Sequence, residues 1–422
     1  MARRLSGQPV ALFKTSARSL QADNLVAMPL ARLLLAIIGM AGLAFTALHA
    51  VLALVAVLAW RIRAAATRSL RANPARMRLP LPPVTLLKPL CGAEPGLYRQ
   101  LRSFCVQDYP EYQIVFGVRD AADPALEVAA RLAAEFPQLP IDIVVDPRQH
   151  GGNGKTSNLI NMLVHARHDV LAIADSDTSV GPDYLATVTT PLLDERVGLV
   201  TSPYHDVPTA LIWSRLGAMY INEWYMPSVL LTWLFGYQGY AGGQTLCLRR
   251  NTLEAIGGLA ATADHLADDY RLNELIRAHG LRTVLSPAQV VAEHHEPALD
   301  SLIRHEMRWM RTIHVLRPRS FRMLFLSFSL PMAVLGLLLA AAQPAAVGSA
   351  VTLFWTVLVA RLGVHFVHRL RDQQRLFSDL WLLPGRDLLL CWVWYRSFFG
   401  SRVSWRGLEL DVDADGVVRR QT

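Results

Sequence analysis

Acidic residues that follow apolar segments are the first candidates for chemistry. The segment VLAIAD (170–175) ends in Asp175-Ser176-Asp177, and YQIVFGV (112–118) is followed by Asp120. A D-x-D turn gathers carboxylate oxygens on one side, and such oxygens are the ligands that Mg²⁺ or Mn²⁺ prefers. Most isolated D-x-D triplets are solvated turns, but a second acidic strand end favours a functional site. We therefore predict a nucleotide diphosphate site, with Asp175 and Asp177 at the metal.

A glycine-rich segment, QHGGNGKTSN (149–158), superficially resembles a phosphate-binding loop. The Walker pattern requires a glycine six residues before the lysine, because consecutive backbone N–H groups wrap the phosphate. Gln149 occupies that position before Lys155, so the sequence does not predict an ATPase loop. Lys155 remains a candidate for countering phosphate charge, and the alternative is a glycine-rich connection with a solvated lysine.

Three further charged segments have both a functional and a structural interpretation. Asp268-Asp269 open a predicted helix, where Asp269 is a candidate general base or simply complements the helix dipole. In LIRHEMRWMRT (302–312), Arg308 is a candidate diphosphate clamp with Trp309 over an acceptor entrance, or the helix is an interfacial anchor. Arg249-Arg250 either meet phosphate or form a surface basic pair.

The elements that must position these residues alternate between strand and helix. Apolar β-rich runs alternate with segments that carry apolar residues at helical spacing. This order predicts an α/β domain with a doubly wound parallel sheet, whose ligands lie beyond the carboxyl ends of the strands. The predicted strands are 84–88, 112–118, 141–145 and 170–175, and the predicted helices are 96–107, 124–135 and 155–166.

The composition is that of a membrane protein. Of 422 residues, 52% are hydrophobic and only 18% are charged. Residues 33–60 form an apolar run long enough to cross about 30 Å of hydrocarbon, and arginines follow it, which predicts that this side is cytoplasmic. The net charge is +8, and the arginines flank apolar runs, which favours lipid headgroups over nucleic acid as the partner.

The C-terminal quarter is apolar again. Residues 323–341 and 345–360 predict a transmembrane hairpin, with the second run rather short. Residues 380–399 are interrupted by Arg386-Asp387, which either pair within a bundle or mark an interfacial segment; we favour membrane association over a third span. The aromatic segment 213–240 reads as interfacial helices that part to admit a lipid, or as an ordinary transmembrane or core helix.

Eight motifs, in this order, resemble a known family. The chain is similar to inverting membrane glycosyltransferases of the ceramide glucosyltransferase type, which are family 21 or family 2-like enzymes. It is most similar to their bacterial branch associated with hopanoid synthesis, and the resemblance covers residues 33–407. The motifs are LLKPLCG (86–92), QDYPEYQ (107–113), VRDAADPA (118–125), GGNGKTSNL (151–159), ADSD (174–177), GGQTLCLRR, ADDYRL and HEMRW.

The resemblance implies a cytoplasmic GT-A domain and assigns roles to residues of this chain. It implies that Asp269 is the base and that Arg308 and Trp309 are the last positions of a Q/R-x-x-R-W signature, whose first position is His305 here. Many ceramide enzymes have Gly at the position of Asp177, so the complete D-x-D strengthens the metal prediction. The residues expected around the donor and acceptor are Lys88, Asp120, Lys155, Asn158, Asp175 and His305.

The resemblance also implies a reaction and a location. The expected reaction transfers N-acetylglucosamine from UDP-GlcNAc to a hopanoid polyol such as bacteriohopanetetrol; the alternative is glucose from UDP-glucose to ceramide. A processive polysaccharide synthase or a nonenzymatic lipid-binding scaffold is less favoured. We expect a multi-pass protein of the bacterial inner membrane. The predicted divisions are a tail (1–32), a transmembrane helix (33–60), the cytoplasmic catalytic domain (82–315, with interfacial helices at about 205–240), transmembrane or interfacial helices (323–400) and a second tail (401–422).

Overall fold

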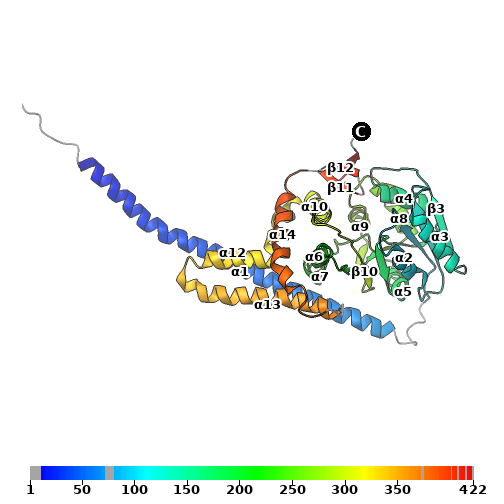
Figure 1. Cartoon of the computed structure of the whole chain (residues 1–422), viewed down its shortest axis with the longest axis horizontal. Coiled ribbons are helices and arrows are strands. Elements are labelled where there is room, and N and C mark those ends of the chain that lie inside the picture. Colours follow the sequence, from blue (N-terminus) through cyan, green and yellow to red (C-terminus); the bar gives the residue numbers. More distant parts are fainter. Residues whose placement is uncertain are drawn as a thin grey trace, which may run out of the picture. The chain divides into compact units, whose positions relative to one another are not determined.

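A computed structural model describes residues 11–71, 80–371, 375–400, 402–405, 408–413 and 416–420. The chain forms two compact units, whose helices and strands are labelled in Figure 1. The first unit comprises Met1–Val51 and Leu324–Gly363, and the second comprises Leu52–Met323 and Val364–Thr422.

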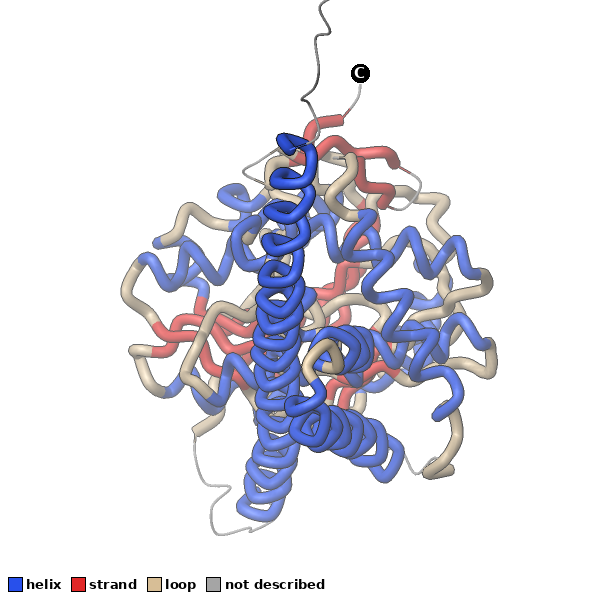
Figure 2. The backbone as a smooth tube through the Cα atoms, turned by 90° about the vertical axis from the view of Figure 1, so that its left-hand side faces the viewer, coloured by secondary structure: helices blue, strands red, loops and turns tan. Residues whose placement is uncertain are grey.

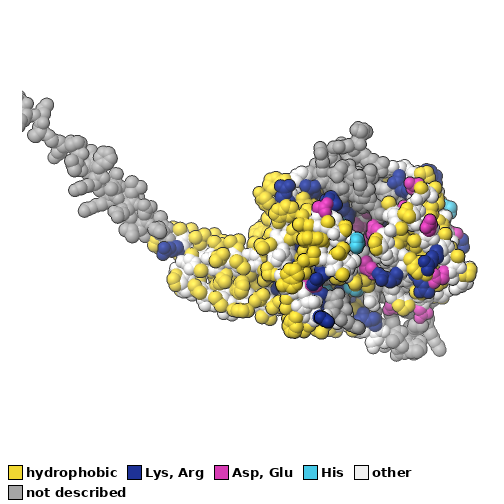
Figure 3. Space-filling view, viewed as in Figure 1, with side chains coloured by type: hydrophobic (Ala, Val, Ile, Leu, Met, Phe, Trp, Pro, Cys, Tyr) yellow, Lys and Arg dark blue, Asp and Glu magenta, His cyan; other side chains and the backbone are white. Residues whose placement is uncertain are grey.

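The first unit is built from apolar helices. It contains the first part of α1 (Ala11–Arg71), all of α12 (Ser329–Ala340) and most of α13 (Val347–Arg371). Small residues let the helices approach closely, since a Cβ on Gly39 would lie 2.6 Å from the Ala340 nitrogen. Hydrophobic side chains predominate over charged ones on the coloured part of this unit in the view of Figure 3. Such a surface suits hydrocarbon better than water.

Two helices of the described chain are long and apolar enough to cross a membrane, Pro29–Ser69 and Pro344–Arg371. The first contains the predicted span 33–60. The hairpin differs from expectation, because α12 has only 12 residues whereas α13 has 25. A proline at position 331 lies in the first turn of α12, where its missing N–H is tolerated, and the helix does not extend further back.

The second unit contains a seven-stranded sheet in the order β3-β2-β1-β4-β8-β6-β9. Strands β1 to β4 are parallel neighbours, as predicted, but β8 runs antiparallel to both β4 and β6. The sheet is therefore mixed and not wholly parallel. The strands are β1 (Val84–Pro89), β2 (Tyr112–Val118), β3 (Ile141–Val145), β4 (Val170–Ile173), β6 (Val197–Thr201), β8 (Leu246–Arg249) and β9 (Arg282–Leu285).

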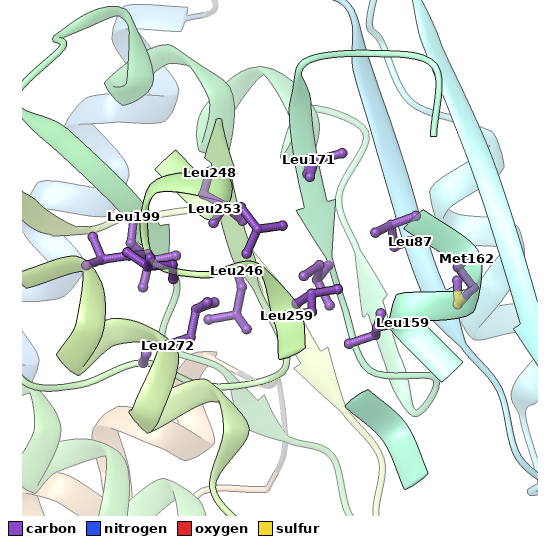
Figure 4. Close-up of a cluster of buried hydrophobic side chains, with 14 of the residues drawn as sticks. Leu87, Leu159, Met162, Leu171, Leu199, Leu246, Leu248, Leu253, Leu259 and Leu272 are labelled. Atoms are coloured by element: carbon purple, nitrogen blue, oxygen red, sulfur yellow. The ribbon is translucent and has the colours of Figure 1, made fainter. Parts of the chain in front are cut away.

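Helices flank this sheet (Figure 2). On one face, leucines of the strands pack against α4, α8 and α9 in a single buried cluster, which includes Leu171, Leu248, Met162 and Leu272 (Figure 4). Elsewhere, α2 and α5 meet through the rings of Phe104 and Tyr184, whose centroids are 5.5 Å apart. The helices are α2 (Leu97–Cys105), α3 (Ala125–Glu135), α4 (Gly154–Leu163), α5 (Tyr184–Thr189), α8 (Arg250–Ala255) and α9 (Asp268–Ala278).

The remaining helices of this unit are formed by the segments that the sequence predicts to be interfacial. Residues 212–234 are continuously helical and contain a π-helical turn, Ile221–Tyr225, between α6 (Ile212–Tyr220) and α7 (Met226–Leu234). Helix α10 (Leu299–Leu316) contains the predicted amphipathic segment, and α11 (Pro318–Arg322) and α14 (Leu383–Arg396) follow. A small sheet pairs β5 (Thr178–Val180), β10 (Val290–Ala292) and β7 (His205–Asp206).

The C-terminal segment is more ordered than a tail. Strands β11 (Arg402–Trp405), β12 (Leu408–Val412) and β13 (Val418–Arg420) form an antiparallel sheet. Its last strand contacts the loop before α9: Val418 N donates to Asp264 O at 2.7 Å, and Leu266 N donates to Gly416 O at 3.0 Å. Residues 416–418 therefore contact the loop that leads to Asp268 and Asp269.

Candidate active site

A buried lysine donates hydrogen bonds to the D-x-D turn. Asp175 follows β4, and the fully buried Lys88 of β1 donates from Nζ to the Asp175 carbonyl and, at 3.3 Å, to Thr178 Oγ1. The same ammonium lies 3.8 Å from the centroid of the Phe104 ring. Burial lowers the pKa of Lys88 to about 7, against the attraction of Asp177 and Asp175. Lys88 therefore fixes the backbone of the turn through its buried ammonium group.

Lys155 connects this turn to α9. Its Nζ lies 2.6 Å from Asp175 Oδ1 and 3.7 Å from Asp268 Oδ2. Burial alone would lower the pKa of Lys155, but the attraction of Asp175, Asp268 and Asp269 outweighs burial and raises it. The lysine reaches this position because Asn153 caps α4, accepting a hydrogen bond from Thr156 N at 3.1 Å. Lys155 is thus an ammonium among three carboxylates, whereas the alternative interpretation made it a solvated lysine.

Asp269 is oriented by backbone donors. Gly243 N donates to its Oδ2 at 2.9 Å, and Tyr270 N donates to its Oδ1 at 2.7 Å. Burial and repulsion by Asp268 raise the pKa of Asp269 to about 6, against the attraction of Lys155. Glycine at position 243 lets these side chains approach the backbone closely, because a Cβ there would lie 2.6 Å from both Asp175 Oδ2 and Lys155 Nζ.

Asp177 lies on the other side of the turn, near histidine. Its Oδ2 is 3.7 Å from His294 Nε2, and His294 Nδ1 is 3.1 Å from Asp206 Oδ1. Burial would lower the pKa of His294, but the charge and hydrogen bond of Asp206 raise it to about 9, with help from Asp177. Burial raises the pKa of Asp177, which His294 opposes. Asp177 Oδ1 is buried and has no hydrogen-bond partner among the described residues.

The carboxylates of the D-x-D turn fit a divalent cation that takes only some of its ligands from the protein. No cluster of three or more His, Cys, Asp or Glu residues able to hold a metal occurs within the described ranges. The buried, unpartnered Asp177 Oδ1 is nevertheless an anionic oxygen available for coordination. Mg²⁺ commonly takes one or two carboxylates from the protein and its other ligands from water and phosphate oxygens. Asp177, with Asp175 beside it, matches that pattern.

Helix α10 reaches the same region through an aromatic group. The rings of His305 and Trp309 have centroids 4.1 Å apart, and His294 lies 5.2 Å from His305 and 5.6 Å from Trp309. Trp309 also stacks on Tyr220 of α6 at 5.4 Å. His305 Nδ1 is 2.7 Å from Glu296 Oε1, yet burial and the nearby Arg308 lower the pKa of His305 to about 4. The signature residues thus adjoin the D-x-D turn through His294.

Two predicted residues lie apart from these contacts. Asp120 is exposed after β2, and its Oδ1 accepts a hydrogen bond from Ala122 N at 2.9 Å. It follows a parallel strand that is separated from β4 by β1, at the same edge of the sheet. Asn158 is buried in α4 and donates from Nδ2 to Gly117 O at 2.7 Å, so it ties the helix to β2. Both side chains thus bond to backbone atoms of β2 or of the turn that follows it.

Several contacts were not anticipated from the sequence. Glu306 and Arg386 form a buried bidentate ion pair at 2.6 and 2.8 Å, which joins α10 to α14. Arg249 donates to the Leu192 and Val197 carbonyls, each within 2.7 Å, so its guanidinium is a backbone clamp and not a free phosphate ligand. His294 had one weak signal, since the polar run EHHE directly follows an apolar strand.

Comparison with known proteins identifies the family. The family model for glycosyl transferase family 21 matches residues 48–418. Ceramide glucosyltransferase 1 of Caenorhabditis elegans is 24% identical over 235 residues, which cover 55% of this chain and 50% of that protein. Ceramide glucosyltransferase 3 of the same species is 22% identical over 77% of this chain and 72% of its own length. The alignment thus spans about half of one relative and more of the other.

Solved structures give a weaker likeness. The mannosyltransferase PcManGT from Pyrobaculum calidifontis, solved with GDP-Man and Mn²⁺, has a TM-score of 0.45 and 18% identity over 83% of this chain and 99% of its own. The family match covers most of the chain, and it confirms the expected glycosyltransferase class at the level of the family. The chain belongs to glycosyl transferase family 21.

Proposed function

We propose that this protein is an inverting glycosyltransferase that moves a sugar from a UDP-sugar to the hydroxyl group of a membrane lipid. The observation that carries the proposal is the hydrogen bond from Gly243 N to Asp269 Oδ2 at 2.9 Å, because the same glycine packs against Asp175 and Lys155. A buried carboxylate is therefore fixed beside a cationic and acidic cluster suited to a nucleotide diphosphate.

Asp269 acts as the general base. A carboxylate whose pKa is raised to about 6 by burial and by Asp268 is still largely ionised at neutral pH and accepts a proton more readily than an ordinary one. It takes the proton of the lipid hydroxyl while that oxygen attacks the anomeric carbon. The bond to UDP breaks on the opposite face, so the configuration at that carbon inverts.

The donor is bound by the strand ends and by α10. Lys155 and Arg308 provide positive charge for the diphosphate, and Asp120 accepts hydrogen bonds from the base or ribose. Lys88 and Asn158 support the loops from beneath, as their buried contacts with Asp175 O and Gly117 O indicate. His305 and Trp309 form the wall between the donor and the acceptor, since both rings adjoin His294.

A divalent ion, Mg²⁺ or Mn²⁺, is the proposed cofactor. Asp177 and Asp175 would hold it against the diphosphate, where it would neutralise charge on the departing UDP. His294, whose pKa is raised to about 9 with Asp206 as its partner, adds a second positive charge at Asp177. The protein side chains then need to stabilise only the remaining charge of the leaving group.

The acceptor enters from the bilayer side. Helices α6 and α7 are apolar and aromatic, and the π-helical turn between them is a feature found often at functional sites. Tyr220 of α6 stacks on Trp309, which connects these helices to α10. Together with the two candidate spans of the described chain, they support a multi-pass membrane protein. The bacterial inner membrane and a cytoplasmic catalytic unit rest on the motif resemblance and on the arginines that follow residues 33–60.

The favoured substrates are UDP-GlcNAc and a hopanoid polyol such as bacteriohopanetetrol, which rest on the motif resemblance. The alternative, UDP-glucose and ceramide, is supported by the names of the curated relatives. A processive polysaccharide synthase would need more membrane helices than the two candidate spans of the described chain. A nonenzymatic scaffold would have no use for a base held by a backbone donor.

Release of UDP tests the proposal. Detergent-purified protein is incubated with UDP-GlcNAc or UDP-glucose and with bacteriohopanetetrol or ceramide, in the presence or absence of EDTA. We expect UDP and a glycolipid from one pair, with a sugar linkage opposite in configuration to the donor. Failure of every pair to yield UDP, with metal supplied, would refute the enzyme proposal. Full activity in EDTA would refute only the proposal that a divalent metal ion is the cofactor.

A further inference from the structure

An apolar cluster connects a membrane helix to the candidate active site. It lies within the second unit and contains residues from the end of α1, from α7, from β9 and from α13. Trp60 of α1 and Trp233 of α7 meet edge to face, with ring centroids 5.0 Å apart. We name this set the α1–α7 cluster; its members are Ala56, Val57, Trp60, Leu230, Leu231, Trp233, Tyr240, Leu285 and Val367.

Tyr240 is the member of the α1–α7 cluster that reaches the acidic site. Its ring packs on the cluster and lies edge to face with Tyr225 at 6.5 Å. Its chain continues through Gly242 to Gly243, whose N–H holds Asp269. A Cβ on Gly242 would lie 2.5 Å from Tyr240 Oη, so glycine makes room for the phenol at this place.

The hydroxyl group of Tyr240 is buried and has no hydrogen-bond partner in the part of the chain that the structure describes. Buried polar groups are almost always paired, so an orphaned one requires an explanation. Burial, together with Tyr225, Asp269 and Asp175, raises the pKa of Tyr240 well above its ordinary value, so the group remains an O–H donor. This donor, which has no acceptor of its own among the described residues, thus belongs to a ring that packs on the apolar cluster, three residues before the Gly243 that holds the general base.

We infer that the Tyr240 hydroxyl donates a hydrogen bond to a second polar atom in the head of the lipid acceptor, next to the hydroxyl that Asp269 deprotonates. This inference rests on the proposed function and adds a residue that determines acceptor specificity. The preferred acceptor is then a lipid alcohol with a neighbouring hydroxyl or amide oxygen. A simple fatty alcohol, which has only the reacting hydroxyl, gains nothing from Tyr240.

The Tyr240→Phe variant isolates this hydrogen bond, because it keeps the ring on the α1–α7 cluster and removes only the hydroxyl. The matched control is Tyr109→Phe, which removes a hydroxyl that donates to the Pro82 carbonyl at 2.6 Å, before the amino end of β1 and away from the strand ends that carry the site. Loss of a bonded hydroxyl should lower the melting temperature, whereas loss of an orphaned one should not.

The experiment uses the full chain in detergent micelles with UDP bound. Dissociation constants are measured for ceramide, for bacteriohopanetetrol and for hexadecanol, and acceptor KM is measured wherever transfer occurs. For Tyr240→Phe we expect about tenfold weaker binding of the multifunctional lipid that the wild type prefers, or about 1.4 kcal/mol. Hexadecanol binding, UDP binding and the melting temperature should stay unchanged. Tyr109→Phe should alter only the melting temperature.

Three results would overturn the inference: equal binding of the multifunctional lipids by wild type and Tyr240→Phe, an equal loss for hexadecanol, or a wild type without preference for either lipid over hexadecanol. The binding measurements do not require turnover. A protein that binds ceramide through Tyr240 but never releases UDP would therefore refute the proposed function and leave only the hydrogen bond between Tyr240 and the lipid. A protein that releases UDP but binds every lipid equally well with and without the Tyr240 hydroxyl would support the proposed function and refute the inference.

Discussion

Lys155 Nζ lies 2.6 Å from Asp175 Oδ1, so the glycine-rich loop and the D-x-D turn are joined by an ion pair. The side chain of Lys155 is only 16% exposed, and its Nζ also lies 3.7 Å from Asp268 Oδ2. A single ammonium therefore balances carboxylates from β4 and α9, and its removal should change their proton affinities as well as donor binding.

Replacement of Lys155 by Met should shift the acidic limb of the pH profile upward. Lys155 lowers the pKa of Asp269, which other causes raise to about 6, and so its loss should raise that pKa further. A base with a higher pKa is protonated over a wider range, so kcat/KM should fall at pH values where the wild type is still active. Initial rates from pH 5 to 9 measure the limb.

Lys155→Arg is the control for this shift, because it preserves the positive charge. The acidic limb should move much less in this variant, even if donor binding weakens. A Lys155→Met profile that loses rate uniformly without moving its acidic limb would contradict the electrostatic role and leave only a role in donor binding.

Asp269→Asn should nearly abolish transfer, because an amide cannot accept the proton of the acceptor. General acid and base groups typically contribute about 10² to 10⁴ in rate. The matched change Asp268→Asn should instead lower the pKa of Asp269, since Asp268 raises it by repulsion. Its acidic limb should therefore move to lower pH. Equal losses in both variants, with no shift in either profile, would remove the distinction between the two carboxylates.

The alternation of strands and helices was predictable because each element is a local pattern. Strands β2 and β3 begin and end at the predicted residues, and Asp268 and Asp269 do open α9. The antiparallel direction of β8 was not predictable, since a strand looks the same in either direction. The ordered C-terminal sheet was missed because its strands are short and polar, and its pairing with residues 264–266 is distant in sequence.

The charged residues of the site were predictable by type but not by partner. The sequence marks Asp175, Asp177 and Asp269 by position at an element's end, whereas proximity of Lys155 to two of those segments depends on tertiary packing. Arg386 was visible as a charge in an apolar run, yet its partner Glu306 lies 80 residues earlier in the chain. The run EHHE is only a weak local signal for His294, because the pairing of β10 with β5 and β7 is what brings it near Asp177 and Asp206.

Gly243→Ala should impair catalysis through a clash at the site. A Cβ there would lie 2.6 Å from Asp175 Oδ2 and from Lys155 Nζ, so the ion pair or the loop must shift. Since the same residue donates to Asp269, we expect kcat to fall even though the melting temperature shows that the variant is still folded under the assay conditions. Gly348→Ala is the control, because a Cβ at that position meets nothing within 4 Å. Comparable kinetics for the two variants would contradict the close packing.

Glu306→Gln should strongly destabilise the second unit. The change leaves the Arg386 guanidinium, which is only 2% exposed, without its anionic partner. Breaking a buried pair in this way costs about 3–5 kcal/mol, whereas replacing both partners by apolar residues is often close to neutral. We therefore expect a large fall in melting temperature for Glu306→Gln and a partial recovery in Glu306→Leu/Arg386→Met. If the double variant loses as much stability as the single variants Glu306→Leu and Arg386→Met lose together, the coupling between the two residues is refuted.

Val418→Pro should slow catalysis from the far end of the chain. The Val418 N–H donates to Asp264 O at 2.7 Å, and Asp264 Oδ1 accepts from Gly152 N at 2.7 Å, so β13 holds the loops that precede both α9 and α4. Proline removes that donor, while the control Val418→Ala retains it. The loss of one such bond costs about 1 kcal/mol of stability, which loosens the loops that carry Lys155 and Asp269, so kcat should fall by at most about fivefold in Val418→Pro. Val418→Ala should stay near the wild-type rate. If the two variants lose rate equally, the effect belongs to the side chain, and the strand does not position Lys155 and Asp269 through its backbone.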